Sequence, residues 1–302
     1  MKNTDTFRQF CWLINTLIQS KKTSLEQIQQ KWINDDLNER KPLSRTTFYR
    51  LRQAIEDMFG IIIECDTNDN YQYFISNPEV LQDNSTQNWM LQTLTVNNVL
   101  TDSLAIKDRL VLEEIPRGME YLQPIIKAIK SSHRLTMGYR KFNDPDGYTA
   151  TIEPYCLKMF RQRWYLLGKN ITEKKKLQIY ALDRVTSLEE TDHPFKMDPL
   201  FHAEAFFKKY FGVFITEDQP VERIVLRAYP PMTNYLRTLP LHHSQKEITI
   251  TDNYSDFEFL IVPSFDFRQA ILKEGSELEV IEPQSFRDEI KQELTKAMKH
   301  YQ

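Results

Sequence analysis

Residues 1–60 carry apolar side chains at intervals of three and four positions, the spacing that gathers them on one side of a helix. The first such stripe consists of Phe7, Phe10, Cys11, Ile14, Leu17 and Ile18. A second, shorter stripe contains Leu25, Ile28 and Trp32. It follows Thr23-Ser24-Leu25-Glu26, which has the form of a capping box, because a hydroxyl can accept an orphan N–H while Glu26 reaches back. The pattern therefore predicts two amphipathic helices.

A third helix is predicted from Ser44 to about Phe59. Ser44 is a favourable N-cap residue, and Gly60 stands where a left-handed residue ends a helix. The side predicted to pack inward carries Phe48, Leu51, Ile55, Met58 and Phe59. The opposite side carries Thr46, Tyr49, Arg50 and Gln53, flanked by Arg45 and Arg52. From Ser44 onward, this helix contains no acidic residue before Glu56.

A β-hairpin is predicted after the third helix. Residues 61–63 and 71–75 are rich in apolar and aromatic side chains, and turn-forming residues separate them. Three helices followed by a hairpin is the order of a winged helix-turn-helix. Asp66-x-Asn68-x-Asn70 also resembles the start of a calcium loop, but Tyr71 and Asn77 stand where glycine and glutamate are required. We interpret this segment as a turn.

The outward side of the third helix has the chemistry of a DNA-reading helix. Arginine can form two hydrogen bonds with guanine, glutamine can pair with adenine, and the helix N-terminus at Ser44 can hold a phosphate. The alternative is a solvated helix surface with no partner, which is an adequate account of any single arginine. The order of the elements, together with an outer surface free of acids, favours DNA binding.

The middle of the chain changes from helical to strand periodicity. Residues 77–87 have the polar composition of a domain boundary, and helices are predicted at 89–106 and 121–131. These helices either pack between domains or form a dimerising, signal-transmitting linker; the pattern does not separate the two. From His133 the period is two, with strands predicted at 133–142, 148–153, 155–161, 163–169, 177–182 and from Arg184. Short strands with tight turns are typical of a small β-barrel.

The C-terminal third is predicted to have a different order of elements. Strands are predicted at 221–228, 247–252, 257–263 and 278–281, and helices at 231–239 and 266–274. This β-α-β-β-α-β order is ferredoxin-like. A last helix, 285–301, places Phe286, Ile290, Leu294 and Met298 four residues apart.

Composition excludes several classes of protein. The 302 residues are 41% hydrophobic and 27% charged, as in folded domains, and no run approaches the ~18 apolar residues of a membrane helix. The polar residues of segment 1–20 do not fit a secretion signal. Three widely spaced cysteines, Cys11, Cys65 and Cys156, fit reduced thiols in a cytoplasmic protein.

Catalytic and metal-binding motifs are not found either. The sequence contains no P-loop, Rossmann glycine pattern, nucleophile elbow or HExxH motif. The adjacent His242 and His243 cannot easily share a metal from a strand. We therefore expect no enzyme activity, no cofactor and no metal.

Positive charge is concentrated in the middle of the chain. The whole chain has a net charge of −3, but residues 121–195 contain 13 basic and 8 acidic residues. The basic residues that the pattern brings together here are Arg140, Lys158, Arg161, Arg163 and Arg184, and the tyrosines among them are Tyr139, Tyr155, Tyr165 and Tyr180. A cationic surface with aromatic rings suits phosphates attached to a stackable base. Segment 174–176, three lysines, reads as a solvated hairpin tip.

Three sequence blocks in this region resemble the WYL domain. Arg163-Trp164-Tyr165-Leu166-Leu167 contains the Trp-Tyr-Leu signature, and Pro154-x-x-Leu157 precedes it at the usual distance. Tyr180-Ala-Leu-Asp-Arg184-Val185 is similar to the second signature of the family. Upstream, Ser44-x-x-Thr47-x-x-Arg50 resembles the recognition helix of winged helices that accompany WYL domains, with Thr46 where that pattern often has arginine. The resemblance covers nearly the whole chain.

The resemblance implies an Sm-like (SH3-like) barrel and a bacterial transcription factor that responds to a nucleotide or nucleic-acid ligand. It implies that Tyr139, Trp164, Tyr165 and Arg184 are pocket or core residues. Alternation along the strand favours core packing for Trp164. Arg184 could instead pair with Asp183. Where the family often has an arginine two residues before Tyr180, this chain has Gln178, so one expected phosphate contact is missing.

The sequence thus predicts a multidomain α+β protein. Its predicted parts are a winged helix-turn-helix at 1–77, a helical linker at 84–131, a WYL ligand-sensing barrel at 132–195 and a ferredoxin-like extension at 200–302. The predicted DNA-binding residues are Ser44, Arg45, Thr46, Thr47, Tyr49, Arg50, Arg52 and Gln53. The predicted ligand-binding residues are Tyr139, Lys158, Arg161, Arg163, Tyr165, Tyr180 and Arg184.

The function expected from these parts is a homodimeric regulator that binds double-stranded DNA under the control of an anionic nucleotide or oligonucleotide. The alternative is a nucleic-acid-binding accessory subunit of a nucleic-acid-processing or defence enzyme. Activation or repression, the operator and the identity of the ligand are not determined by the sequence.

Overall fold

The computed structural model describes residues 2–35, 41–81, 85–102, 108–111, 117–142, 144, 146–173, 176–216 and 219–302. The chain divides into two compact units, Met1–Leu112 and Glu113–Gln302, each with a core of its own. Arg40, and Lys174 and Lys175 of the predicted hairpin tip, lie outside the described residues.

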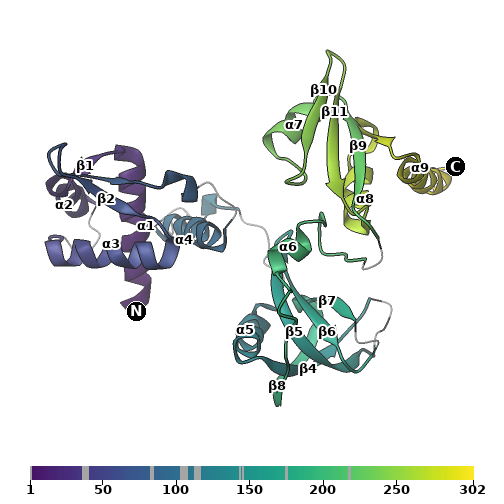
Figure 1. The fold of residues 1–302 in the computed structure, drawn as a ribbon, viewed down its shortest axis with the longest axis horizontal. Coiled ribbons are helices and arrows are strands. Elements are labelled where there is room, and N and C mark those ends of the chain that lie inside the picture. Colours follow the sequence, from purple (N-terminus) through teal and green to yellow (C-terminus); the bar gives the residue numbers. More distant parts are fainter. Residues whose placement is uncertain are drawn as a thin grey trace. The chain divides into compact units, whose positions relative to one another are not determined.

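The first unit contains the predicted helices and hairpin (Figure 1). Its helices are α1 (Lys2–Ser20), α2 (Leu25–Asn34), α3 (Arg45–Phe59) and α4 (Thr86–Asp102), with a 3₁₀ turn at Pro78–Leu81. Its strands, β1 (Thr23–Ser24), β2 (Ile63–Asp66) and β3 (Gln72–Ile75), form an antiparallel sheet in the order β1-β3-β2. Side chains from α1, α2, α3 and the hairpin share one core, to which α4 adds Leu91.

The ends of α3 form as the sequence predicts. The Ser44 Oγ accepts a hydrogen bond from the Thr47 N–H at 3.1 Å, and Gly60 ends the helix at φ +67°. Phe48, Leu51, Ile55 and Phe59 are buried, but Met58 is 37% exposed, so its predicted inward orientation is wrong. Successive helical residues are about 100° apart, which places Met58 at the border of the apolar stripe beside Phe59.

The capping box of α2 uses different residues from those predicted. Ser24, not Thr23, is the N-cap, and its partner is Gln27 instead of Glu26. Thr23 is buried and pairs with Tyr73 of the hairpin as the short strand β1. A tertiary strand pairing therefore moves the start of the helix one residue along the chain.

The turn of the hairpin is held by Asp66. Its Oδ1 accepts hydrogen bonds from the N–H groups of Asn68 and Asp69 at 3.1 and 3.2 Å. Its Oδ2 accepts one from the Lys22 ammonium at 2.9 Å. The interpretation as a turn is confirmed.

The N-terminal part of the second unit is a five-stranded antiparallel sheet. Its strands are β4 (His133–Tyr139), β5 (Tyr148–Phe160), β6 (Arg163–Asn170), β7 (Leu177–Ala181) and β8 (Val185–Pro194), in the order β7-β6-β5-β4-β8. β5 is one strand with an irregularity between Pro154 and Cys156, where the sequence predicts two strands. The described pairings do not join β7 to β8, so closure into a barrel stays a prediction.

Helix α5 and two 3₁₀ turns, η3 and η4, accompany this sheet. Helix α5 (Leu122–Ser131) covers one face with the buried Ile125 and Ala128. The 3₁₀ turns η3 (Met119–Tyr121) and η4 (Leu182–Arg184) contact each other. Between them lies Gly118, at φ +98°, where a Cβ would stand 2.4 Å from the carbonyl carbon of Leu182. Only glycine combines this conformation with such a close approach.

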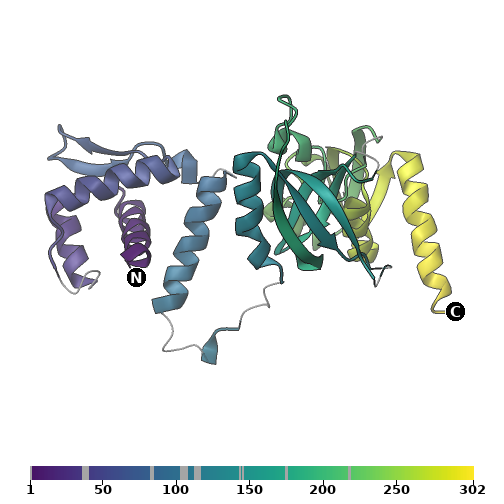
Figure 2. The same cartoon turned by 90° about the horizontal axis from the view of Figure 1, so that it is seen from below.

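The C-terminal part of the second unit is a four-stranded antiparallel sheet, β10-β11-β9-β12. Its elements are β9 (Glu222–Ala228), α7 (Met232–Thr238), β10 (Lys246–Ile250), β11 (Ser255–Ile261), α8 (Phe265–Lys273) and β12 (Leu278–Glu282). The predicted β-α-β-β-α-β order is confirmed. The last helix, α9 (Gln284–Lys299), is yellow in Figure 2 and buries Phe286 and Ile290, whereas Leu294 and Met298 are exposed. A short helix, α6 (Ala203–Phe207), joins the two sheets.

Candidate nucleic-acid and ligand sites

The outer side of α3 is displayed to solvent in the first unit. Arg45, Thr46, Tyr49, Arg50 and Gln53 are exposed, while Thr47 and Arg52 are partly covered. The guanidinium groups of Arg45, Arg50 and Arg52 have no hydrogen-bond or ion-pair partner among the described residues. These cations are therefore available to an external anion.

The uncharged polar groups of this surface are engaged within the unit. The Ser44 and Thr47 hydroxyls lie 2.8 Å apart, and the Gln53 amide donates to the Asp57 carboxylate at 3.0 Å. The Tyr49 hydroxyl lies 3.3 Å from that of Tyr73 on β3. The hairpin thus holds the Tyr49 side chain of the helix surface in place. Among the described residues, only the arginines and Thr46 on this surface have no such hydrogen bond.

The hairpin tip carries carboxylates rather than cations. Lys22 forms ion pairs with Asp66 and Asp69, and these contacts raise the pKa of Lys22, chiefly through the hydrogen bond with Asp66. The same bond lowers the pKa of Asp66. Because Lys22, which precedes β1, only partly offsets the two carboxylates of the tip, the tip is a poor contact for a phosphate.

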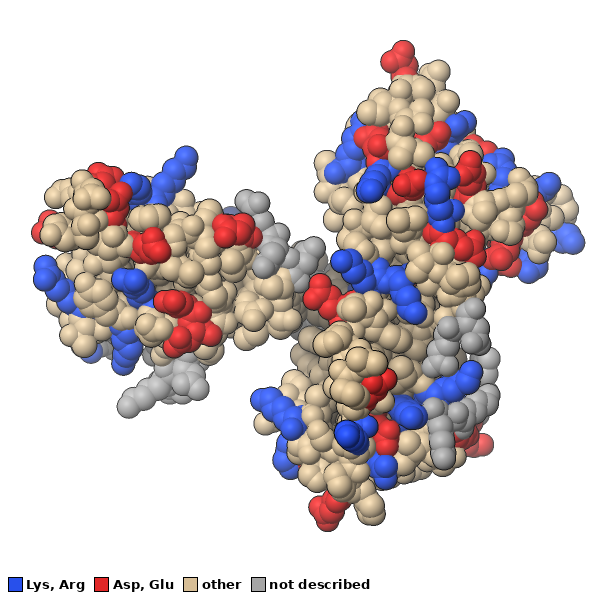
Figure 3. Space-filling model, viewed as in Figure 1, with Lys and Arg blue, Asp and Glu red and all other residues tan. Residues whose placement is uncertain are grey.

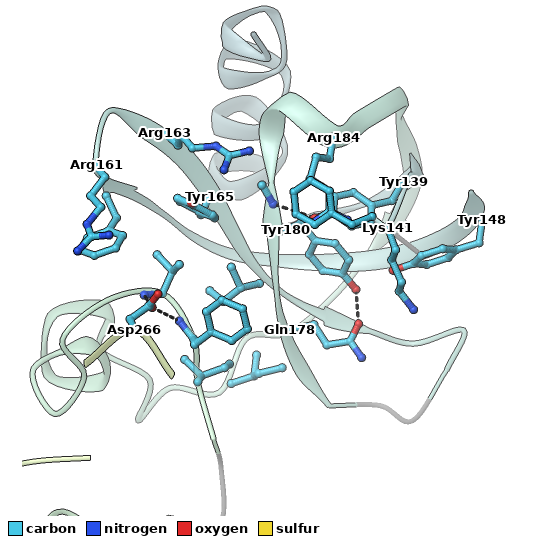
Figure 4. A pocket seen from close by; sticks show the side chains of 18 residues that line it. Tyr139, Lys141, Tyr148, Arg161, Arg163, Tyr165, Gln178, Tyr180, Arg184 and Asp266 are labelled. Atoms are coloured by element: carbon cyan, nitrogen blue, oxygen red, sulfur yellow. Dashed lines mark hydrogen bonds between the residues drawn. The ribbon is translucent and has the colours of Figure 1, made fainter. Parts of the chain in front are cut away.

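A cavity of about 660 Å³ opens in the second unit, next to strands β6 and β7 (Figure 4). Its size suits a small ligand. It is lined by Tyr139, Lys141, Phe142, Tyr148, Phe160, Arg161, Arg163, Tyr165, Leu177, Gln178, Ile179, Tyr180, Ala181, Arg184, Val213, Phe214, Ile215 and Asp266. Six of the seven predicted ligand-binding residues lie in this lining; Lys158 does not.

The cations of the cavity are held by neighbours to different extents. Arg163 forms an ion pair with Asp183, whose carboxylate raises the pKa of the guanidinium. Arg184 donates from Nε to the Arg140 carbonyl at 2.9 Å, and its guanidinium carbon lies 3.8 Å from the ring centroid of Phe142. The predicted alternative of an Arg184–Asp183 pair is therefore replaced by an Arg163–Asp183 pair.

Arg161 occupies a strained turn. The hairpin between β5 and β6 has Arg161 at φ +47° and Gln162 at φ +63°. Two-residue hairpin turns of this handedness favour asparagine and glycine, and other residues pay roughly 1–3 kcal/mol each for the left-handed backbone. The turn places the Arg161 guanidinium at the cavity, with its carbon 5.2 Å from the ring centroid of Phe160.

Tyrosines form the polar part of the cavity wall. The Tyr139 hydroxyl accepts from the Ala181 N–H at 3.2 Å, and the Tyr180 hydroxyl donates to the Gln178 carbonyl oxygen at 2.8 Å. Burial raises the pKa of Tyr139, Tyr165 and Tyr180, so their hydroxyls stay protonated near neutral pH. Tyr165 has no hydrogen-bond partner among the described residues, which leaves a donor for a ligand.

Lys158 has a different position from the other predicted residues. Its ammonium donates to the Gly212 carbonyl at 2.7 Å and lies 4.1 Å from the ring centroid of Phe207. Burial lowers its pKa to about 8, and the nearby Asp266 partly opposes this shift. The side chain thus fastens strand β5 to the segment that precedes Val213, Phe214 and Ile215 in the cavity wall.

Several residues of the cavity wall come from outside the signature blocks and were not predicted from the sequence. Lys141 and Phe142 follow β4 after one intervening residue, Arg140, and the Lys141 ammonium lies 4.6 Å from the Tyr148 ring centroid. Their position two and three residues after Tyr139 was a usable signal. Asp266 and residues 213–215 are distant in sequence, and no local pattern marks them.

The described parts of the chain show neither a helix able to cross a membrane nor a cluster of three or more residues suited to hold a metal. Figure 3 shows basic and acidic side chains interspersed over the C-terminal domain of the second unit. Such mixing does not mark a further polyanion surface there.

Comparison with known proteins identifies two domains. The WYL domain model matches residues 120–190, and the WCX domain model matches residues 220–298. No curated protein sequence matches the chain.

Two solved structures match the chain at low identity and low TM-score. Proteasome accessory factor B/C (PafBC) of Arthrobacter aurescens has 16% identity and a TM-score of 0.37, over 95% of this chain and 45% of that one. A CRISPR Cas-related protein has 11% identity and a TM-score of 0.41, over 86% of this chain and 65% of that one. The chain thus spans less than half of the first structure and under two thirds of the second. The chain thus contains a segment that matches the WYL domain model, followed by a segment that matches the WCX domain model.

Proposed function

We propose that this protein is a DNA-binding transcription regulator whose activity is controlled by an anionic nucleotide or oligonucleotide bound in the WYL cavity. One observation supports the proposal above the others: the chain has two separate cationic surfaces of different form. One is an exposed helix surface with unpaired arginines, and the other is an aromatic cavity with held cations.

In this proposal α3 of the first unit enters the major groove. Arg50 and Arg45 contact bases or phosphates, while Ser44 and Thr47 keep the helix N-terminus formed. A homodimer reads a two-fold DNA site, with residues 1–77 as the DNA-binding domain and 84–131 as the linker. The ligand binds at the WYL domain, residues 132–195, whether or not its sheet closes into a barrel. The extension at 200–302 completes the cavity wall. No catalytic step is assigned to any residue.

The ligand is proposed to be anionic because the described residues of the cavity lining include four basic residues and one acidic one. Aromatic rings beside these cations favour a phosphate attached to a base over an isolated phosphate. A coupling of roughly 1–3 kcal/mol between ligand and DNA binding would change DNA affinity about 5- to 150-fold.

The experiment has two arms on the full chain. In the first, DNA selected by the protein from a random pool is used in gel-shift titrations with the parent and with Arg50→Ala. We expect the variant to lose at least about tenfold in affinity without a change in thermal unfolding. Lys291→Ala, which removes an exposed cation from α9, serves as the control. Equal affinities of the Arg50 variant and the parent would exclude the proposed DNA surface.

In the second arm, calorimetry measures binding of single-stranded DNA hexamers to the parent and to Arg184→Ala. We expect the variant to keep its DNA affinity in the first assay but to lose hexamer binding and the response to it. Equal hexamer affinity in both proteins would exclude the proposed ligand site.

A further inference from the structure

Among the described residues, Asp266 is the one acidic residue in the lining of the cavity. The four basic residues of the lining, Lys141, Arg161, Arg163 and Arg184, come from the WYL domain, whereas Asp266 comes from the WCX domain. A carboxylate weakens binding of a plain polyanion through like-charge repulsion. A carboxylate at this position therefore favours a ligand that carries other polar groups besides its negative charges.

The position of the carboxylate is fixed on one side by the backbone. Asp266 lies in the first turn of α8, and its Oδ2 accepts hydrogen bonds from the N–H groups of Val213 and Phe214 at 2.6 and 2.8 Å. Gly212 permits this approach, since a Cβ on that residue would stand 2.2 Å from the same oxygen. Two hydrogen bonds and a close backbone contact hold the side chain in one orientation.

The other carboxylate oxygen is unused. Oδ1 accepts no hydrogen bond from the described residues, and the side chain is only half-buried, so this oxygen is reachable from the cavity. Figure 4 shows Asp266 on the side of Arg161, away from Lys141 and Tyr148. The cavity thus offers one fixed acceptor among several cationic donors.

A fixed carboxylate oxygen can only accept a hydrogen bond, because the ionised group has no proton to donate. Among the bases of a nucleic acid, the matching donors are the exocyclic amino groups of adenine, cytosine and guanine. Thymine and uracil have none, and their ring N–H lies between two carbonyl oxygens that repel a carboxylate. A phosphate near this oxygen would be repelled as well.

We propose that Asp266 is a specificity-determining residue that accepts a hydrogen bond from the amino group of a nucleobase in the WYL cavity. This inference rests on the proposed function and extends it: the ligand contains an adenine, cytosine or guanine, and the WCX domain takes part in reading it. The basic residues bind the phosphates, and Asp266 selects among the bases.

The test uses the full chain and four single-stranded DNA hexamers, dA6, dC6, d(GT)3 and dT6, with binding measured by calorimetry. We expect the parent to bind at least one amino-bearing hexamer about tenfold or more tightly than dT6, which is the range of one hydrogen bond to a charged group. In Asp266→Asn, one oxygen still accepts from Val213 and Phe214, while an NH₂ donor replaces the free acceptor. The preference should fall to about twofold or less, or reverse in favour of dT6.

Asp252→Asn is the matched control, since it removes an equal charge from an exposed turn between β10 and β11. It should leave the order of affinities unchanged. Thermal unfolding of Asp266→Asn should match the parent, because the hydrogen bonds to the backbone are kept.

Failure of this inference and failure of the proposed function give different results. Tight binding of all four hexamers with equal affinity, or an unchanged preference in Asp266→Asn, overturns the role of Asp266 and leaves the ligand class standing. If the parent binds none of the hexamers, both the proposed nucleic-acid ligand and the proposed role of Asp266 are excluded.

Discussion

The α3 surface of the first unit and the cavity of the second unit both present arginines, but they hold them differently. On α3, Arg45 and Arg50 extend into solvent without a partner among the described residues. In the cavity, Arg163 is paired with Asp183, and Arg184 lies against an aromatic ring and a backbone carbonyl.

This difference corresponds to two kinds of anion. Exposed, unpaired arginines can adjust to a regular phosphate backbone, and their binding weakens steeply with salt because counterions are released. Cations held at fixed positions select a ligand by shape at the cost of some attraction. The comparison therefore predicts an adaptable electrostatic contact in one unit and a preorganised site in the other.

The largest expected effect is a loss of DNA affinity in Ser44→Asp, a variant that keeps the N-cap of α3 but adds a negative charge there. Ser44→Asp keeps a side-chain oxygen for the Thr47 N–H, and aspartate is as good an N-cap as serine. The free energy of unfolding should stay unchanged, but the added negative charge at the helix N-terminus should weaken DNA binding by about tenfold or more. Gel-shift titration and urea unfolding measure the two quantities.

Ser44→Ala is the reverse variant. It removes the cap without adding charge, so we expect a loss of about 1 kcal/mol in stability and a smaller loss of DNA affinity than in Ser44→Asp. If the alanine variant loses more DNA affinity than the aspartate variant, charge does not dominate at this end of α3.

A middle-sized effect is expected from the ion pair in the cavity. Asp183→Asn removes the carboxylate that neutralises Arg163, so the guanidinium becomes available to a ligand. We expect a roughly three- to fivefold gain in affinity for an anionic hexamer, measured by calorimetry, with a small loss of stability. An unchanged or lower affinity would mean that Arg163 orients the wall instead of attracting the ligand.

The smallest effect is expected from Lys158, the one predicted ligand residue outside the cavity lining. Burial holds its pKa at about 8, below the value of about 10.4 expected in the unfolded chain. Between these two values the unfolded chain binds more protons, so the free energy of unfolding rises with pH. Relative to Lys158→Met, the parent should gain up to about 1 kcal/mol from pH 7 to 9, after allowance for partial exposure.

Urea unfolding at both pH values measures this gain. Lys246→Met, a change at an exposed lysine of β10, should run parallel to the parent. Parallel curves for Lys158→Met and the parent would show that the ammonium does not lose its proton in this range.

Most of the fold could be predicted from the sequence because burial repeats along each element. The apolar stripe of α3 and its flanking Ser44 and Gly60 define the helix without any distant contact. The ferredoxin-like order of 222–282 follows from alternating strand and helix periods in the same way. The α2 cap was mispredicted because Thr23 is taken by β3, a pairing that no local pattern contains.

The residues of the site could be predicted from the sequence only where they lie together in one continuous segment. Tyr139, Tyr165 and Arg184 lie in or beside the signature blocks, and alternation along β6 separates the buried Leu166 from Tyr165 at the cavity. The partners of these residues were not predictable. Asp183 could have formed an ion pair with Arg163 or with Arg184. Asp266 reaches the cavity through tertiary packing alone.

Gly118 brings two parts of the second unit that are distant in sequence into direct backbone contact. It is the sixth residue after Leu112, where the first unit ends, and its backbone touches the peptide between Leu182 and Asp183. That peptide precedes Arg184 in the cavity wall. With no side chain between the two backbones, any residue larger than glycine at position 118 would have to displace the peptide that precedes Arg184.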